Sequence, residues 1–186
     1  MRVVLVSSAS PQLINPMVMP PLGLLHLGAV LKGQGADVIY HDANVDGPFP
    51  GADVYGVTGV SPQAVSMREI IKRLRAEGEY IVAGGPHATL FPKVVEGWGA
   101  DCVVVGEGEE VIIPIAQTKH KGIIKADRIK GLDGLPFPDR SDAARYTYAL
   151  DGRMATTMMS TRGCPYSCAF CCGALWGHLV TTRSAE

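Results

Sequence analysis

Residues 54–85 read VYGVTGVSPQAVSMREIIKRLRAEGEYIVAGG. The run begins with a short apolar segment at 54–57 and ends with another at 80–83, and both are rich in β-branched residues, as buried strands are. Between them, residues 64–77 carry apolar side chains at every third or fourth position and basic side chains on the opposite face. The stretch therefore predicts two buried strands joined by an amphipathic helix.

The same alternation extends in both directions from this unit. Further strands are predicted at 3–6, 38–40 and 102–105, and further helices at 22–32, 92–98 and 109–117. Buried strands that alternate with helices are typical of a parallel sheet with both faces covered. The sequence thus predicts a doubly wound, mostly parallel α/β sheet of five strands, a Rossmann-like domain over residues 1–118.

Composition excludes some classes of partner. The chain has 186 residues, of which 47% are hydrophobic, and 17 basic residues against 18 acidic ones. This balance gives no electrostatic case for a nucleic-acid partner, for which a basic face would be expected. No segment approaches the ~18 consecutive apolar residues of a membrane span, and the apolar run at 3–6 is too short for a signal peptide. We therefore expect a cytoplasmic protein with neither nucleic-acid nor membrane partners.

The character of the sequence changes after residue 118. Residues 119–140 are predicted to form a linker rich in Gly and Pro, with a hairpin in its basic first half. Residues 141–186 form a final part with two predicted strands, 146–150 and 154–160. A part of this size is too small to hold a core by itself, and such pieces usually depend on a metal, a disulfide or a partner.

Four of the five cysteines fall within nine residues of this final part. Thiolates are ligands for iron–sulfur clusters and for zinc. Cys164, Cys168 and Cys171 are close enough in sequence to converge on one inorganic group. A structural zinc site needs a fourth ligand, for which Cys172 and His178 are the candidates. Three thiolates alone would leave one iron of a 4Fe–4S cluster open to another ligand.

The spacing Cys164-x-x-x-Cys168-x-x-Cys171, with Phe170 before the third cysteine, resembles the cluster motif of the radical S-adenosylmethionine (radical SAM) enzymes. The resemblance implies that the three cysteines hold a 4Fe–4S cluster. It further implies that S-adenosyl-L-methionine binds the open iron and that Phe170 lies beside its adenine. In that family an electron from the cluster cleaves the sulfonium and generates a 5′-deoxyadenosyl radical.

The preceding domain resembles the cobalamin-binding domain found in one branch of the same family. The resemblance is carried by Pro20–Leu25, Gly84–Thr89, Gly106–Glu109 and Leu135–Asp139, in that order. It implies cobalamin as a further cofactor. Ligands of open α/β sheets lie at the carboxyl ends of the strands, which is where several of these segments are expected.

Eight residues at these strand ends are the candidate cobalamin contacts. They follow the third, fourth and fifth predicted strands and comprise Ser61, Gly84, Gly85, Pro86, His87, Gly106, Glu107 and Gly108. Glycines at these positions allow a ligand to approach the backbone closely. His87 could equally be a turn residue, and Glu107 could serve only as a favourable charge near a helix N-terminus.

Two departures from the family pattern bear on function. The first strand is followed by Ser7-Ser8-Ala9-Ser10-Pro11 rather than by the cobalt-ligating Asp-x-His-x-x-Gly motif of better-known cobalamin domains. We therefore expect cobalamin to bind without a histidine on cobalt. Only 15 residues follow Cys171, so we expect a truncated start of the radical SAM partial barrel that is catalytically incomplete alone. The rest of the barrel is then a candidate partner chain.

The first functional hypothesis is that the chain is the N-terminal part of a cobalamin-dependent radical SAM enzyme. Such an enzyme would perform methyl transfer or related radical chemistry. The alternative is a non-catalytic or truncated cobalamin-binding module with an incomplete cluster loop. A third hypothesis is a flavodoxin-like domain with a zinc-binding tail. The substrate stays open, because its contacts would come mainly from later barrel residues.

Overall fold

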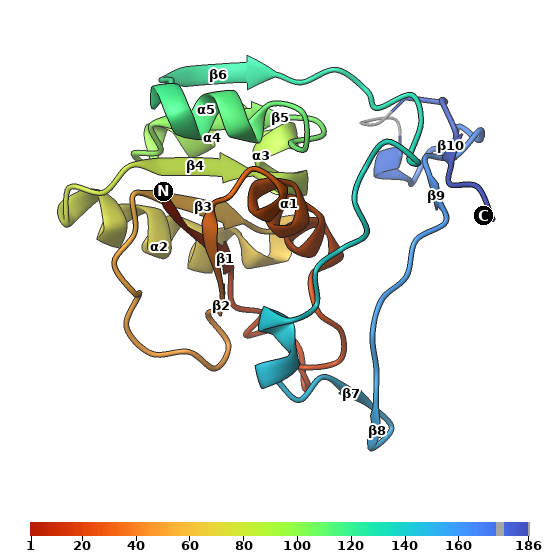
Figure 1. The fold of residues 1–186 in the computed structure, drawn as a ribbon, viewed down its shortest axis with the longest axis horizontal. Coiled ribbons are helices and arrows are strands. Elements are labelled where there is room, and N and C mark those ends of the chain that lie inside the picture. The colour runs from red at the N-terminus through yellow and green to blue at the C-terminus, as the bar shows by residue number, and fades with distance from the viewer. Residues whose placement is uncertain (174–176, 186) are drawn as a thin grey trace.

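A computed structural model describes residues 1–173 and 177–185. Its centre is a parallel sheet in the order β2-β1-β3-β4-β5-β6 (Figure 1). The strands are β1 (Arg2–Ser7), β2 (Asp37–Asp42), β3 (Val54–Thr58), β4 (Ile81–Gly84), β5 (Cys102–Val105) and β6 (Gly122–Lys125). The chain first builds outward from β1 to β2 and then returns to the other side of β1 with β3. The strand order therefore reverses between β1 and β3, and the carboxyl edge there is the usual ligand position in such sheets.

Alternation of side chains along each strand gives the sheet two separate apolar faces. Val3 and Leu5 of β1 point to one face, where α1 (Leu22–Gly33) and α5 (Ile112–Thr118) pack. Val4 and Val6 point to the other. That second face is covered by α2 (Ala64–Ala76), α3 (Gly85–Leu90) and α4 (Pro92–Gly97). The prediction of a doubly wound α/β sheet is confirmed.

The sheet has one strand more than predicted. Residues 122–125 form β6, which pairs in parallel with β5 from Cys102↔Gly122 to Val105↔Lys125. The hairpin expected in this part of the linker is wrong, because the Gly-Ile-Ile-Lys segment reaches the open edge of β5 and pairs there instead. The domain boundary at residue 118 stays a prediction, although β6 lies beyond it.

Two helical expectations also change. The predicted helix at 109–117 begins only at Ile112, so Glu109 and Glu110 precede it rather than occupy its first turn. The turn after β4 leads directly into the short helix α3, which is not among the helices predicted from the sequence. A short 3₁₀ helix, η1 (Ser61–Gln63), precedes α2.

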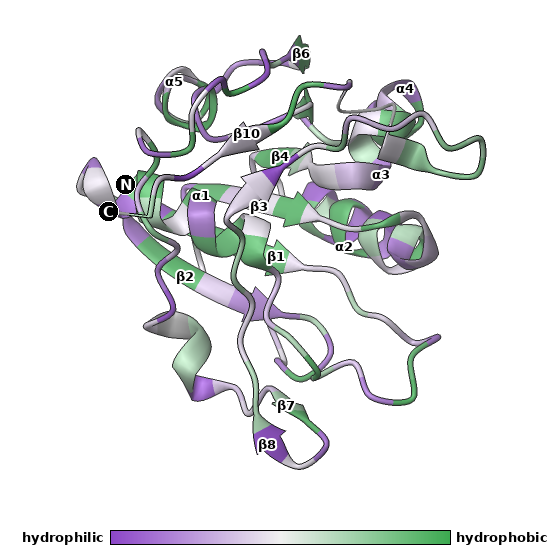
Figure 2. Cartoon of the chain, turned by 90° about the vertical axis from the view of Figure 1, so that its right-hand side faces the viewer, coloured by the Kyte–Doolittle hydropathy of each residue, from purple (hydrophilic) through white to green (hydrophobic). Residues whose placement is uncertain are grey.

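The remaining chain crosses the carboxyl edge of the sheet. After the 3₁₀ helix η2 (Asp142–Arg145) it forms a hairpin of β7 (Ala149–Leu150) and β8 (Arg153–Met154), much shorter than the two predicted strands. A second antiparallel pair joins β9 (Thr161–Arg162) to β10 (Thr181–Thr182). Figure 2 looks onto the carboxyl ends of the strands and shows β10 in front of them. No helix among the described residues is long and apolar enough to cross a membrane.

Candidate functional site

A cavity of about 560 Å³ lies at the carboxyl ends of β1, β3, β4 and β5. Its volume is in the range of ligand pockets, ~300–1,000 Å³. The floor is one face of the sheet and consists of alternate residues of the four strands: Leu5, Ser7, Gly56, Thr58, Val82, Gly84 and Val104. The ends of α1 and α5 border it, and Met159 and Thr161–Gly163 line it as well. A mostly apolar, concave site at the reversal of strand order is thus present.

Missing side chains help to create this space. A Cβ added at Gly84 would meet nothing closer than Val104 Cβ at 3.9 Å, so a larger side chain there would enter the cavity. A Cβ at Gly56 would instead lie 2.9 Å from Leu5 Cδ2. Gly56 therefore allows Leu5 to pack over β3, whereas Gly84 leaves the floor bare.

Gly85 has a different, conformational role. Its φ is +86°, which L-residues rarely adopt, and an added Cβ would lie 2.1 Å from Thr58 Oγ1. The hydroxyl of Thr58 donates to the Gly84 carbonyl at 3.3 Å. Gly85 thus turns the chain from β4 into α3 and keeps that turn against the end of β3.

Six of the eight predicted cobalamin contacts line the cavity. They are Gly84, Gly85, Pro86, Gly106, Glu107 and Gly108. Ser61 and His87 are not among its described lining residues, but the structure brings these two together, with Ser61 Oγ 3.1 Å from His87 Nδ1.

His87 is a buried residue of the opposite face. Its ring stacks on Trp98 with centroids 5.4 Å apart and contacts Phe91 at 5.1 Å. Its Nε2 has no hydrogen-bond partner among the described residues. Burial lowers the pKa of His87 below its ordinary value of 6.5, which favours the neutral ring. Its surroundings therefore match a core histidine.

Glu107 belongs to a buried ion cluster that no pattern in the sequence indicates. Its Oε1 accepts from Arg128 Nη1 at 2.6 Å and from Arg162 Nη1 at 3.2 Å, and its Oε2 accepts from the Ile129 N–H at 2.6 Å. Glu109 Oε1 accepts from Arg162 Nη2 at 2.6 Å. Both carboxylates thus accept hydrogen bonds from arginines that are 21–55 residues distant in sequence.

The charge of Arg162 is secured by these partners. Burial by itself would lower the pKa of Arg162, but the hydrogen bonds and charges of Glu109 and Glu107 outweigh it and raise the pKa. The interpretation of Glu107 as only a favourable charge near a helix N-terminus is incomplete, since Glu107 and Glu109 are both ion-pair partners before α5 begins.

The predicted metal ligands follow directly after this cluster. Cys164, Cys168 and Cys171 are all exposed, as is Cys172, and Phe170 is 94% exposed. The Gly173 N–H donates to Cys171 Sγ at 3.2 Å. Within the described ranges no three His, Cys, Asp or Glu side chains gather as a metal site would require. The donor types suit an iron–sulfur cluster, but the thiols are not assembled around a common centre.

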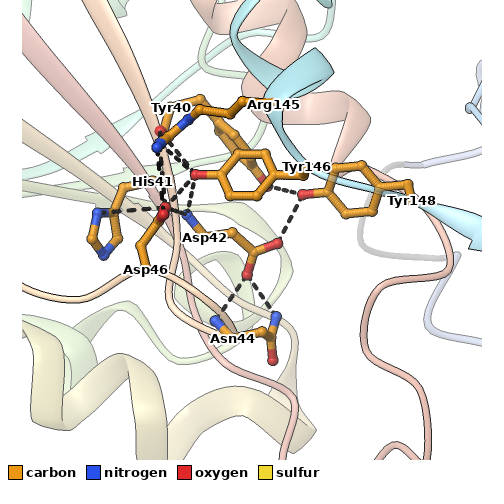
Figure 3. Close-up of polar contacts among 8 residues, drawn as sticks. All are labelled: Tyr40, His41, Asp42, Asn44, Asp46, Arg145, Tyr146 and Tyr148. Carbon is orange, nitrogen blue, oxygen red and sulfur yellow. Dashed lines mark hydrogen bonds and ion pairs between the residues drawn. The ribbon is translucent and has the colours of Figure 1, made fainter.

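A second polar cluster, shown in Figure 3, lies at the end of β2. The Asp42 carboxylate accepts from Tyr148 Oη at 2.8 Å and from Asn44 Nδ2 at 2.7 Å. Tyr148 Oη also lies 3.1 Å from Tyr40 Oη. These bonds join β2 to a segment more than 100 residues later and dock residues 142–148 on the sheet. No motif in the sequence indicates this cluster.

Comparison with known proteins decides the family. The B12 binding domain family matches residues 16–115, which is more than half of the chain. The chain belongs to the B12-binding domain family. The matched residues include the turns after β3 and β4 and the Gly106–Glu109 segment. The resemblance found from the sequence is therefore confirmed.

Relatives of this B12-binding domain include longer methyltransferases. It is 31% identical over 164 residues to an uncharacterised methyltransferase of Synechocystis, covering 83% of this chain and 29% of that protein. It is 29% identical over 173 residues to bacteriochlorophyllide d C-12(1)-methyltransferase of Chlorobaculum tepidum, covering 89% and 38%. The chain thus spans between about a quarter and two fifths of the length of these two relatives.

The fold of the B12-binding domain is matched by a solved structure. OxsB, a cobalamin-dependent S-adenosylmethionine radical enzyme solved with aqua-cobalamin and S-adenosylmethionine, superimposes with a TM-score of 0.66. The match has 19% sequence identity and covers 91% of this chain and 28% of OxsB. At this identity the comparison supports the fold.

Proposed function

We propose that the protein binds cobalamin in the cavity at the carboxyl edge of the sheet and works as part of a cobalamin-dependent radical SAM enzyme. The observation that carries this proposal is the 560 Å³ cavity with a floor that lacks a side chain at Gly84. Methyl transfer, or related radical chemistry, is the proposed reaction class, in keeping with the methyltransferases to which the chain is similar.

The residues of the cavity suit a large, amide-bearing ligand. The apolar floor and the ends of α1 and α5 can cover hydrophobic parts of cobalamin, and Thr58 and Ser7 offer hydroxyls at the strand ends. When bound, cobalamin supplies the group-transfer chemistry, and the protein orients it and limits access of water. The expectation that no histidine ligates cobalt stays a prediction.

The cysteine segment is the proposed site of the second cofactor. Cys164, Cys168 and Cys171 present three exposed thiols with the spacing of the radical SAM motif, and three thiolates leave one iron of a 4Fe–4S cluster for S-adenosyl-L-methionine. Phe170 is exposed beside the third cysteine and is available to contact the adenine. The role of these residues is to hold the cluster and its nucleoside next to the cavity.

A cobalamin-binding module without cluster chemistry is the second candidate. It is favoured by the dispersed thiols, since no three metal-ligating side chains of the described part gather. Iron and acid-labile sulfide after anaerobic reconstitution, together with formation of 5′-deoxyadenosine from S-adenosyl-L-methionine, separate the two candidates.

The cavity assignment can be tested by filling it. Gly84→Leu should place its side chain in the cavity, and cobalamin would have to displace a buried leucine, which costs ~1.5–3 kcal/mol or about 10- to 150-fold in affinity. Gly97→Leu is the matched control, because Gly97 is exposed on α4 and has no atom within 4 Å of an added Cβ.

Titration of hydroxocobalamin, followed by its visible spectrum, measures both variants. The parent and Gly97→Leu should bind equally, and Gly84→Leu should bind more weakly. Equal binding by Gly84→Leu would place the site elsewhere, and a parent protein that does not bind cobalamin would refute the proposed function.

A further inference from the structure

The cysteine loop (residues 163–173) begins directly after β9, and β9 is a wall of the cavity. Thr161, Arg162 and Gly163 all line the cavity, and Cys164 follows them. The way in which β9 is held therefore determines where the first cysteine lies relative to the cavity.

Arg162 holds β9 against the turn that follows β5. Its guanidinium donates Nη1 to Glu107 and Nη2 to Glu109, at 3.2 Å and 2.6 Å. The three side chains are only 11%, 5% and 6% exposed. A planar guanidinium that spans two fixed carboxylates has little orientational freedom, because both of its donors are committed in one plane.

The Glu107 carboxylate is also connected, through Arg128, to the chain that leads to β10. Glu107 binds Arg128, and Arg128 Nη2 donates to the Leu179 carbonyl at 3.4 Å. That carbonyl packs on Gly163: a Cβ at Gly163 would lie 2.1 Å from it, and Gly163 has a φ of +94°. Glu107 thus anchors the chain on both sides of the cysteines.

A buried ion cluster is a weak source of stability, because desolvation of the charges offsets much of their attraction. Its hydrogen bonds nevertheless define one geometry. Here that geometry joins the cavity turn, which holds Glu107 and Glu109, to the strand that leads into the cysteines.

We propose that Arg162 is a positioning residue that, through Glu107 and Glu109, holds the cysteine loop at a fixed place beside the cavity. The inference rests on the proposed function for its purpose, which is to set the separation between cobalamin and the iron–sulfur cluster. The anchoring itself concerns only this chain's own residues and can be tested without either cofactor.

Amide hydrogen exchange of the cofactor-free protein tests the anchoring. Arg162→Met should raise exchange by about tenfold or more in residues 161–163 and 179–182, while β1 and β3 keep their protection. Arg162→Lys, which retains the charge, should restore part of the protection. Arg75→Met is the control, since Arg75 pairs with the buried carboxylate of Asp101 at 3.2 Å, outside the cavity.

Two outcomes would overturn the proposal. One is raised exchange throughout the sheet, which indicates a general loss of stability, and the other is unchanged exchange at β9 and β10. If Arg162→Met does not fold, a double variant that combines it with Glu109→Gln can be used. The double variant removes the charges of both Arg162 and Glu109 and leaves the Glu107–Arg128 pair in place. The double variant should show the same local increase, and protection at the parent level would refute the proposal.

The positional consequence is measured in protein loaded with cob(II)alamin and reduced cluster. Both centres are paramagnetic, and electron paramagnetic resonance detects their distance-dependent interaction. The parent and Arg75→Met should show one defined interaction, which Arg162→Met should weaken or spread although its iron and cobalamin contents stay the same. An unchanged interaction in Arg162→Met, or none in the fully loaded parent, would overturn the inference. Failure of the parent to bind either cofactor would refute the proposed function instead, and the exchange data would still decide the anchoring.

Discussion

Gly84 and Gly85 are neighbours, and the structure predicts opposite responses to the same added methyl group. Gly85 has a φ of +86°, and its new Cβ would lie 2.1 Å from Thr58 Oγ1. Gly84 is extended, with a φ of −152°, and its new Cβ would meet only Val104 Cβ at 3.9 Å. Alanine should therefore destabilise the fold at position 85 and be accepted at position 84.

The expected loss at position 85 has two parts. An alanine in the left-handed region costs ~1–2 kcal/mol. Rotation of Thr58 away from the new methyl breaks its hydrogen bond to the Gly84 carbonyl, for a further ~0.5–1.5 kcal/mol. Gly85→Ala should thus lower the free energy of unfolding by about 1.5–3.5 kcal/mol, whereas Gly84→Ala should raise it by ~0.4–1 kcal/mol through a less flexible unfolded chain.

Urea denaturation followed by far-ultraviolet circular dichroism, without cofactor, measures both changes. At a typical slope of ~1–3 kcal/mol per M, the midpoint of Gly85→Ala should fall by about 1 M. A midpoint of Gly85→Ala equal to that of the parent would show that the turn after β4 does not need a left-handed residue. A midpoint of Gly84→Ala well below that of the parent would show that Gly84 does not tolerate a side chain and would undo its use for blocking the cavity.

Three other outcomes are expected. Anaerobically reconstituted Cys164→Ala should lose its iron and Cys172→Ala should keep it, and full iron retention in the first would contradict the cluster assignment. Tyr148→Phe removes a donor to the buried Asp42 carboxylate and should cost ~1.5–3 kcal/mol in urea unfolding, unlike Tyr166→Phe at an exposed tyrosine. Burial lowers the pKa of His87 in the folded state. Below about pH 6.5 the unfolded chain therefore binds a proton that the folded chain does not bind, and the free energy of unfolding decreases as the pH is lowered. Between pH 7.5 and 5.5 the urea midpoint should fall less in His87→Phe than in the parent, and an equal fall would exclude this cause.

The sheet was predictable because its signals are local. Each predicted strand is a short apolar run, and the predicted strand at 102–105 matches β5 residue for residue. The strand β6 was missed since Gly-Ile-Ile-Lys is too short to be distinguished from a loop, and its pairing partner is known only once β5 has an open edge. The amino-acid composition of a segment cannot show where a sheet still has an unpaired edge.

The site was predictable at the level of strand ends and not at the level of contacts. Gly84, Gly85 and Gly106 line the cavity because the carboxyl ends of parallel strands meet at one edge. The partners of Glu107 could not be found, because Arg128 and Arg162 reach it only after the chain has returned across the sheet. Pairings over such sequence distances follow from the tertiary fold, and the isolated Arg and Glu residues carry no local pattern.

The tyrosine cluster of Figure 3 has a consequence for contacts between molecules. β2 is an edge strand, and such strands can pair with a strand of another copy and start aggregation. Here the Tyr40 carbonyl accepts from Arg145 and Tyr146, and the Asp42 N–H donates to the Asp46 carboxylate and to Tyr146 Oη. These backbone groups are already bonded to side chains, so an incoming strand finds no partners at this position. The segment that docks on β2 therefore also protects this end of the β2 edge against pairing with another strand.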